Sequence, residues 1–186
     1  MVMSSTRKAL DDNMITIRDD LLRMFSLVDR ATEGSFRAFR NHDIELANAC
    51  VAEDQPLDDL MNKTEELITR TIALQQPTAR DLRILIADLL IATELERMGD
   101  HAQGTAKTVL RYEKGSDTPL PDQLPEMERK VRAMLSLCSE AFIEWSAEKA
   151  RACAELDSEL DTLYNSLFSG IVKQMQKGKL RVERGT

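Results

Sequence analysis

Aromatic residues are scarce in this sequence: one Trp, two Tyr and five Phe make up 4% of its 186 residues. Sheets are rich in aromatic and β-branched residues, whereas the Ala, Leu, Glu, Arg and Met that abound here favour helices. Apolar residues form 42% of the chain, which is enough for a hydrophobic core and argues against global disorder. The composition therefore predicts an all-α protein.

An excess of positive charge is also missing. Lys and Arg number 25 against 32 Asp and Glu, which gives a formal net charge of −7. A general nucleic-acid binder needs a basic face, and adhesion to anionic lipid needs clustered Lys and Arg. We therefore expect neither a nucleic-acid partner nor electrostatic attachment to a membrane.

Long hydrophobic runs are absent. The most apolar stretch, residues 82–92 (LRILIADLLIA), contains Arg83 and Asp88 and is too short to span a bilayer. The first residues show no signal-peptide pattern. We expect a soluble, cytoplasmic protein without a membrane span.

Cysteine and histidine are rare. Cys50, Cys138 and Cys153 lie far apart and form no CxxC motif, so we interpret them as small buried residues in a reducing cytoplasm. Neither of the two histidines lies in a recognisable nucleophile motif, and no Gly-rich phosphate loop is present. The sequence therefore predicts a protein that is not an enzyme.

Apolar residues recur at spacings of three and four along five segments, which predicts five helices. The predicted helices cover residues 7–40, 43–74, 78–114, 126–147 and 148–177. Pro77 should restrict Gln76 to extended backbone and end the second helix, and Thr78 to Asp81 have the form of a capping box. The third helix is apolar over so wide an arc that we expect neighbouring helices to bury it.

The stretch with Gly and Pro at residues 115–125 marks a boundary, and we predict a linker over residues 116–125 between two domains. Helices of about 30 residues joined by short turns must run antiparallel. We therefore predict a first domain over residues 1–115, formed by a three-helix bundle, and a second domain over residues 126–186 with two helices.

An internal repeat appears when the chain is shifted by 103 residues. Cys50 then falls on Cys153, Asp54 on Asp157 and Asp58 on Asp161. The repeat predicts two tandem antiparallel three-helix bundles. The second would lack its last helix, whose counterpart would begin near residue 180, as in a truncated chain or a piece of a longer one. We expect an unpaired apolar stripe there to aggregate or to recruit a helix from another chain.

Three pairs of carboxylates are spaced four residues apart: Asp54 and Asp58, Glu96 and Asp100, and Asp157 and Asp161. Side chains at this spacing share one face of a helix, and like charges there are mutually unfavourable. A cation that bridges the pair reverses that effect, and hard or borderline cations take carboxylate oxygens readily. Other acidic pairs in the chain have the same spacing, so a solvated helix face is the alternative interpretation.

Antiparallel helices that turn near residue 76 bring the pairs at 54/58 and 96/100 to the same height. Gly99 lies beside the second pair, and glycine inside a helix costs about 1 kcal/mol relative to alanine, which indicates a close approach of the neighbouring helix. The spacing predicts a four-carboxylate metal site for iron, manganese, zinc or magnesium. His101 is a weaker candidate ligand, since it points about 100° away from Asp100. Pro56 lies between Asp54 and Asp58 and frees the carbonyl of Ala52, so it is expected either to kink the helix and splay this half of the site or to supply an oxygen to it.

Two sequence motifs occur on the predicted third helix, and the second follows the first after about one helix length. They are QQPTARDLR at residues 75–83, with Pro77, Asp81 and Arg83, and LERMGDHA at residues 95–102, with Arg97 and Gly99. Together with the D-x-x-L-D patterns at residues 54–58 and 157–161, they resemble the PhoU family of phosphate-uptake regulators. The resemblance covers residues 7–177 in order.

The resemblance implies two tandem three-helix bundles, usually in a homodimer, with multinuclear metal clusters on E/D-x-x-x-D motifs. It also implies a non-enzymatic adaptor between the ATPase of the phosphate ABC transporter and a phosphate-sensing histidine kinase, which represses the phosphate-starvation response. Asp157 and Asp161 would form half a metal site, because the second LER-x-GDHA motif is absent.

Two other functions compete with this reading. A ferritin-like di-metal oxidase needs Glu-x-x-His motifs inside one bundle, and the sequence contains none. A helical scaffold without bound metal, whose acidic pairs are only solvated, is the second alternative.

Overall fold

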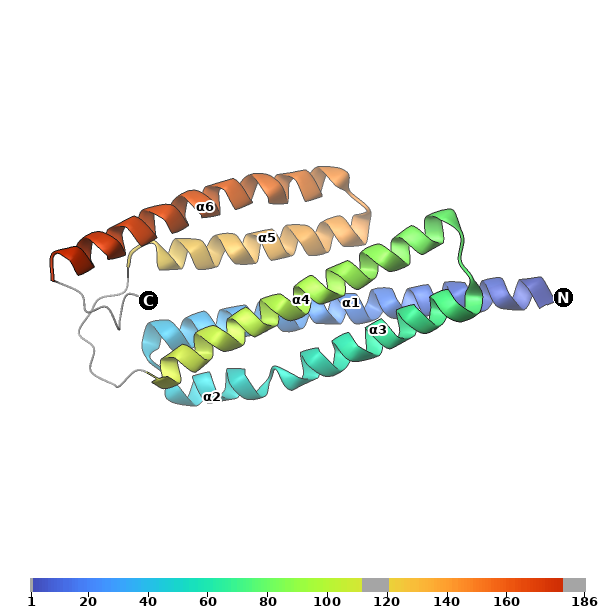
Figure 1. Cartoon of the computed structure of the whole chain (residues 1–186), viewed down its shortest axis with the longest axis horizontal. Helices are drawn as coiled ribbons and strands as arrows, with labels where there is room; N and C mark the ends of the chain where they lie inside the picture. Colours follow the sequence, from blue (N-terminus) through green and yellow to red (C-terminus); the bar gives the residue numbers. More distant parts are fainter. Residues whose placement is uncertain (1, 112–120, 179–186) are drawn as a thin grey trace. The chain divides into compact units, whose positions relative to one another are not determined.

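The computed structural model of this chain describes residues 2–111 and 121–178, with side chains from residue 7 onward. Within those residues the fold is all-α, without a strand, as the composition predicts (Figure 1). The helices are α1 (Val2–Asn41), α2 (Ile44–Ala52), α3 (Gln55–Gln75), α4 (Ala79–Arg111), α5 (Leu124–Glu144) and α6 (Ala147–Gln176). The chain forms two compact units, residues 1–112 and 113–186.

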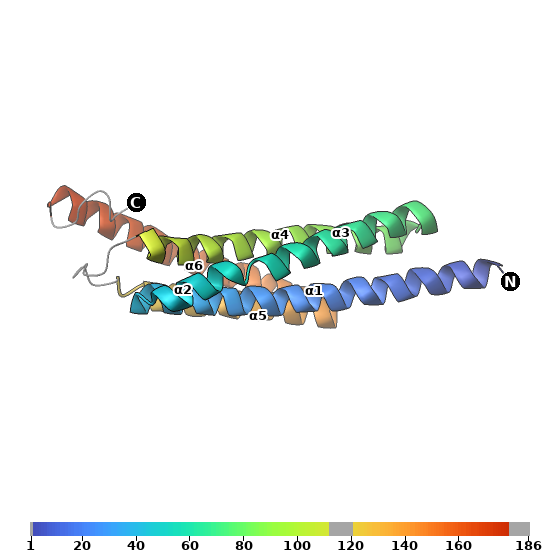
Figure 2. The same ribbon diagram turned by 90° about the horizontal axis from the view of Figure 1, so that it is seen from below.

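The first unit is a three-helix bundle in which α1 and α4 pack against the rod formed by α2 and α3 (Figures 1 and 2). Its centre is filled by aliphatic side chains that recur every three or four residues along the helices. The largest fully buried ones are Ile17, Leu21 and Met24 of α1, Ile68 of α3 and Leu85 of α4. These positions confirm the helical periodicity read from the sequence.

The predicted single helix over residues 43–74 is wrong, because the rod is broken between α2 and α3 at Glu53 and Asp54. Pro56 lies in the first turn of α3, where its missing N–H costs no hydrogen bond. The start of α2 follows expectation, since the Asp43 side chain accepts a hydrogen bond from the backbone N–H of Leu46 at 3.0 Å.

The turn between α3 and α4 differs from the extended backbone expected at Gln76. Gln76 adopts the left-handed conformation (φ 48°, ψ 54°), and its N–H donates to the carbonyl of Ile72. The proline at position 77 disfavours the right-handed helical region for Gln76, and the left-handed region is the other way to end a helix abruptly. Asp81, in the first turn of α4, accepts a hydrogen bond from Arg7 of α1 at 2.7 Å and so ties this turn to α1.

Helix α4 is not buried on all sides in the part of the chain that the structure describes, and this corrects the expectation from its wide apolar arc. One face, with Leu85, Ala92 and Leu95, is buried against the bundle. The opposite face exposes Ile86 and Leu90, which lie one turn apart and are 47% and 63% exposed.

The second unit contains the antiparallel hairpin of α5 and α6. Its turn repeats the junction of α1 and α2 at the same shift of 103 residues. His42 and Trp145 are both left-handed, with φ of 50° and 56°. The next residue in each case, Asp43 or Ser146, accepts a side-chain hydrogen bond from the N–H three residues later. The internal repeat is therefore present in backbone geometry.

The two repeats differ where Pro56 stands. Its counterpart at the shift of 103 is Glu159, and α6 continues through that position without a break. Glu159 instead pairs with Lys130 of α5 at 2.5 Å. Proline therefore explains why the first repeat has a break where the second has a continuous helix.

The domain limits 1–115 and 126–186 remain a prediction. Residues 116–120 of the predicted linker, and the expected position of a further helix near residue 180, lie outside the described residues. Helix α5 begins at Leu124, two residues before the predicted start. None of the helices in the described part of the chain is long and apolar enough to cross a membrane.

Candidate carboxylate site

Asp54 lies at the break between α2 and α3, where it occupies the N-cap position of α3. Its side chain makes no capping hydrogen bond to that helix. Instead, its Oδ2 accepts a hydrogen bond of 2.5 Å from the side-chain amide of Gln103 on α4. Gln103 in turn accepts a hydrogen bond from the ammonium of Lys107. The break thus leaves the first candidate carboxylate directed toward α4.

Asp54, Asp58, Glu96 and Asp100 influence one another electrostatically, and we call these four residues the carboxylate cluster. Burial raises the pKa of Asp54, and the negative charges of Asp58 and Asp100 raise it further. The charge of Lys107 and the hydrogen bond from Gln103 lower this pKa in part. The pKa of Glu96 is raised by burial and then by Asp100, Asp58 and Asp54. The first bundle therefore brings together the four carboxylates that the sequence placed at one height.

Gly99 provides the close approach between α3 and α4 at this cluster. A Cβ at position 99 would overlap Cδ2 of Leu57 and would lie 3.7 Å from Oδ1 of Asp54. Leu57 is only 2% exposed, so it has little room to move away. The absence of a side chain at position 99 thus lets the first turn of α3 pack against the backbone of α4.

A cavity of about 10 Å³ lies behind Asp54, with Gln103, Leu57 and Gly99 among its lining residues. That volume holds about one water molecule. A phosphate ion or a small organic substrate does not fit into it. The cluster is therefore suited to small ions or to surface contacts and not to the binding of an organic substrate.

The donor atoms suit a hard divalent cation, because its two positive charges would offset half of the four negative charges and relieve their mutual repulsion. Their present arrangement is open. Across residues 2–111 and 121–178, no three His, Cys, Asp or Glu side chains are grouped so that they could hold a metal ion. An ion at the cluster would therefore require side chains to turn.

The other predicted site residues are exposed or pair with other side chains. His101 is exposed on α4, and its backbone carbonyl accepts from the hydroxyl of Thr105. Asp157 and Asp161 are exposed on α6 of the second unit. Arg97 lies next to Glu96 but pairs with Glu94 at 2.8 Å. Arg83 is likewise exposed on α4.

The sequence analysis did not identify Gln103 or Lys107. Gln103 donates a hydrogen bond to Asp54, and Lys107 donates one to Gln103. A signal for both was present. Gly99, Gln103 and Lys107 are spaced four residues apart, so they share the face of α4 that meets α3. The ammonium of Lys107 offsets part of the charge of Asp54, and the amide of Gln103 donates a hydrogen bond to it.

Comparisons with known proteins agree with the repeat and with the fold. A family model described as the PhoU domain matches residues 21–109 and again residues 124–185. The chain is 30% identical over 182 residues to a phosphate-specific transport system accessory protein PhoU homolog of Clostridium acetobutylicum, covering 97% of this chain and 83% of that one. A homolog with the same description from Zymomonas mobilis is 34% identical over 95% of this chain and 75% of its own length.

A solved structure shares the architecture. The crystal structure of the phosphate transport system regulatory protein PhoU from Streptococcus pneumoniae has a TM-score of 0.83 and 28% identity to this chain. The match covers 90% of this chain and 79% of that one. Two helical repeats and the four-carboxylate face are thus found in a chain similar to proteins whose names refer to phosphate transport.

Proposed function

The chain belongs to the PhoU family, and we propose that it regulates phosphate uptake as an adaptor that links the phosphate ABC transporter to a sensor kinase. Relatives described as accessory and regulatory proteins of phosphate transport support a role without turnover. The absence of a catalytic motif in the sequence is consistent with such a role. Its partners would be the ATPase of the transporter and the phosphate-sensing histidine kinase, and its effect would be repression of the phosphate-starvation response.

The observation that carries this proposal is the match of the PhoU domain to both repeats of the chain, over residues 21–109 and 124–185. The carboxylate cluster adds a way to respond to conditions. When a divalent cation is bound, it would offset part of the negative charge that Asp54, Asp58, Glu96 and Asp100 place on one face of the first bundle. Iron, manganese, zinc and magnesium all suit these donors.

A homodimer is also part of the proposal. Ile86 and Leu90 form an exposed apolar pair on α4, and apolar side chains at the spacing i, i+4 are a common element of helix–helix interfaces. Size-exclusion chromatography with light scattering on the full chain would test it. A dimer that Leu90→Glu converts to a monomer, with the helical content retained, is the expected result. A wild-type monomer at micromolar concentration would contradict it.

The function itself is tested in a bacterium that lacks its own PhoU protein and carries a reporter of the phosphate-starvation response. Expression of this chain should lower the reporter signal in high phosphate, and the tagged chain should retain the transporter ATPase and the kinase in a pull-down. A reporter that stays fully active, with the protein folded and present at normal levels, would contradict the regulatory role. Retention of neither partner would contradict the adaptor role.

A matched pair of variants separates the cluster from the helix surface. Glu96→Gln/Asp100→Asn removes two charges from the cluster, and Glu65→Gln/Glu66→Gln removes two charges from exposed positions on α3. If the cluster is the regulatory element, only the first variant changes the reporter signal. Equal behaviour of the two variants would favour a scaffold in which the acidic side chains are only solvated.

A further inference from the structure

Two thiols face each other across the α5–α6 hairpin. The Sγ atoms of Cys138 on α5 and Cys153 on α6 are 3.2 Å apart, in hydrogen-bond contact. The Cys153 thiol also lies 3.5 Å from the backbone carbonyl of Met134. A disulfide needs a sulfur–sulfur distance of about 2.0 Å, so an approach of roughly 1 Å would allow the bond to form. This contact corrects the expectation of three isolated, buried cysteines, because Cys138 is exposed and paired.

The internal repeat shows that this pair is a property of the second unit. At the shift of 103 residues, Cys153 corresponds to Cys50 and Cys138 corresponds to Ser35. In the first unit, Cys50 lies close to Gly34, the neighbour of Ser35, since a Cβ on that glycine would be 2.8 Å from the cysteine Sγ. Both repeats therefore bring the same two helical turns together, and only the second places a thiol on each of them.

The pair is accessible from one side only. The residue Cys138 is exposed although its sulfur is partly buried, whereas Cys153 is 8% exposed. A small reagent can therefore reach Cys138 directly, and Cys153 can attack the adduct from within the hairpin. The two sulfurs supply an attacking and a resolving thiol, as a disulfide exchange requires.

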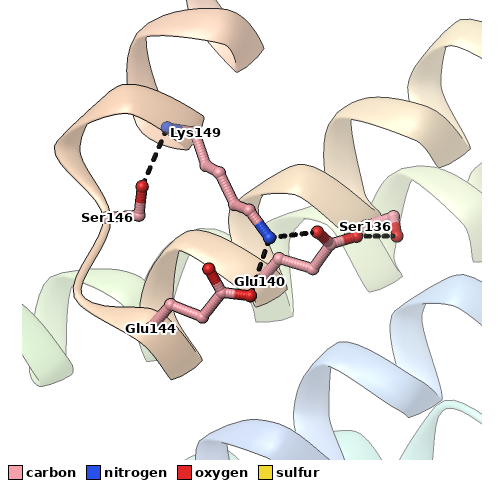
Figure 3. Close-up of polar contacts among 5 residues, drawn as sticks. All are labelled: Ser136, Glu140, Glu144, Ser146 and Lys149. Carbon is pink, nitrogen blue, oxygen red and sulfur yellow. Dashed lines mark hydrogen bonds and ion pairs between the residues drawn. The ribbon is translucent and has the colours of Figure 1, made fainter.

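The hairpin around the thiols has little buried surface. Within the described residues of α5 and α6, only Leu135 and Cys153 are buried. Polar contacts also hold the two helices together. Near the turn, the ammonium of Lys149 lies between Glu140 at 2.6 Å and Glu144 at 2.7 Å (Figure 3). Ion pairs that are exposed to this degree contribute little to stability. A covalent link between the two helices would therefore increase the stability of the hairpin substantially.

We propose that Cys138 and Cys153 form a reversible disulfide by exchange with a small-molecule disulfide such as oxidised glutathione. The Cys138 thiolate attacks one sulfur of the reagent, which releases one thiolate and leaves a mixed disulfide. The Cys153 thiolate then attacks the Cys138 sulfur and releases the second thiolate. Two electrons pass from the protein to the reagent, and the two protons of the protein thiols end on the two released thiols.

The surroundings of Cys138 set the rate of this exchange. Burial of its sulfur raises the pKa of the Cys138 thiol, and the neighbouring Cys153 thiol raises it further. The attacking thiolate is therefore scarce at neutral pH, and exchange speeds up as the pH increases. The pair would respond to sustained oxidising conditions and not to brief exposure.

The test uses the full chain in buffers of defined ratios of reduced to oxidised glutathione. Free thiols are then blocked with a maleimide, and the linkages are mapped by proteolysis and mass spectrometry. We expect one intramolecular link that joins the peptides containing Cys138 and Cys153, loss of two free thiols per chain, and reversal by dithiothreitol. We also expect an increase in Tm of roughly 5 °C or more on oxidation.

Two variants make the outcome decisive. Cys50→Ser removes the thiol of the first unit and should leave the link and the gain in Tm unchanged. Cys138→Ser changes an exposed residue, so the protein should still fold. This variant should lose both the disulfide link and the gain in Tm. Glutathione adducts at either residue without a link between them, or links only between separate chains, would overturn the proposal.

Discussion

Leu57 of α3 packs directly against Gly99 of α4, so closely that a methyl group at position 99 would overlap its Cδ2 atom. Two opposing effects therefore act on Gly99→Ala. Alanine gains about 1 kcal/mol of helix propensity, and overpacking against a buried leucine costs about 1–3 kcal/mol. We expect a net loss of about 1 kcal/mol in the free energy of unfolding, measured by urea denaturation.

Gly104 is the matched control, since it lies on the same helix and a Cβ there would meet nothing within 4 Å. Gly104→Ala should increase the free energy of unfolding by about 0.5–1 kcal/mol. The second substitution Leu57→Ala, made on the Gly99→Ala background, should cost less than it does in the wild type. Equal stabilisation by Gly99→Ala and Gly104→Ala would show that the two helices are not in close contact at this point.

Asp88 is buried on α4, and burial raises its pKa to about 6, with the charge of Arg18 opposing the shift. Since the folded-state pKa lies above the unfolded one, the neutral carboxyl stabilises the fold below about pH 4, and this contribution is lost as the pH rises through 6. Asp88→Asn should therefore increase the free energy of unfolding at pH 8 by about 1–2 kcal/mol more than at pH 4. Denaturation at both pH values measures the difference.

The exposed residue Asp12 on α1 provides the control for Asp88. Asp12→Asn removes the same charge from the surface and should change stability by similar, small amounts at both pH values. If Asp88→Asn shows no greater pH dependence than Asp12→Asn, the carboxyl of Asp88 is not destabilised by its burial.

Asp20 has a 2% exposed side chain and receives a hydrogen bond of 2.8 Å from Lys63 of α3, whose side chain is 56% exposed. Lys63→Met would leave the carboxylate buried, with Arg23 still 3.6 Å away. We expect a loss of about 1–3 kcal/mol in the free energy of unfolding, because the buried carboxylate loses its charge-assisted hydrogen bond from Lys63. Lys8→Met, at an exposed position of α1, should have almost no effect.

Much of the fold follows from periodic patterns, and the departures have local causes. The stripe of Ile17, Leu21 and Met24 was readable because a helix buries every third or fourth residue. The break at Asp54 could not be read from the sequence, because the apolar periodicity continues across it. Proline is compatible both with a kink inside a helix and with the first turn of a new helix. The exposure of Leu90 was not readable either, since composition does not tell which part of a wide apolar arc a small bundle covers.

The relative height of Asp54 and Gly99 was predictable from the sequence, whereas the orientation of the carboxylates was not. The antiparallel turn fixes the height of Asp54 relative to Gly99, and a Cβ at position 99 would lie 3.7 Å from Oδ1 of Asp54. The orientation of each carboxylate depends on side-chain rotamers and on partners such as Gln103, which spacing alone does not determine. The thiol contact between Cys138 and Cys153 likewise depends on the register of the hairpin, which the turn at Trp145 sets.

The carboxylate cluster predicts a specific response to divalent cations. Magnesium or manganese should increase the Tm of the wild type in proportion to the logarithm of its concentration above the Kd, because an ion that binds only the folded state stabilises it. Glu96→Gln/Asp100→Asn should reduce this increase strongly. An identical increase in the variant would mean that the ions act elsewhere on the protein.

The most direct test of the central claim is the metal content of the purified protein after incubation with iron, manganese, zinc or magnesium and removal of excess ions. Wild type, Glu96→Gln/Asp100→Asn and the control Glu65→Gln/Glu66→Gln are compared by elemental analysis. The account predicts stoichiometric metal in the wild type and the control, and its loss in the cluster variant. Absence of metal from all three, or equal metal in all three, would contradict a metal site at Asp54, Asp58, Glu96 and Asp100.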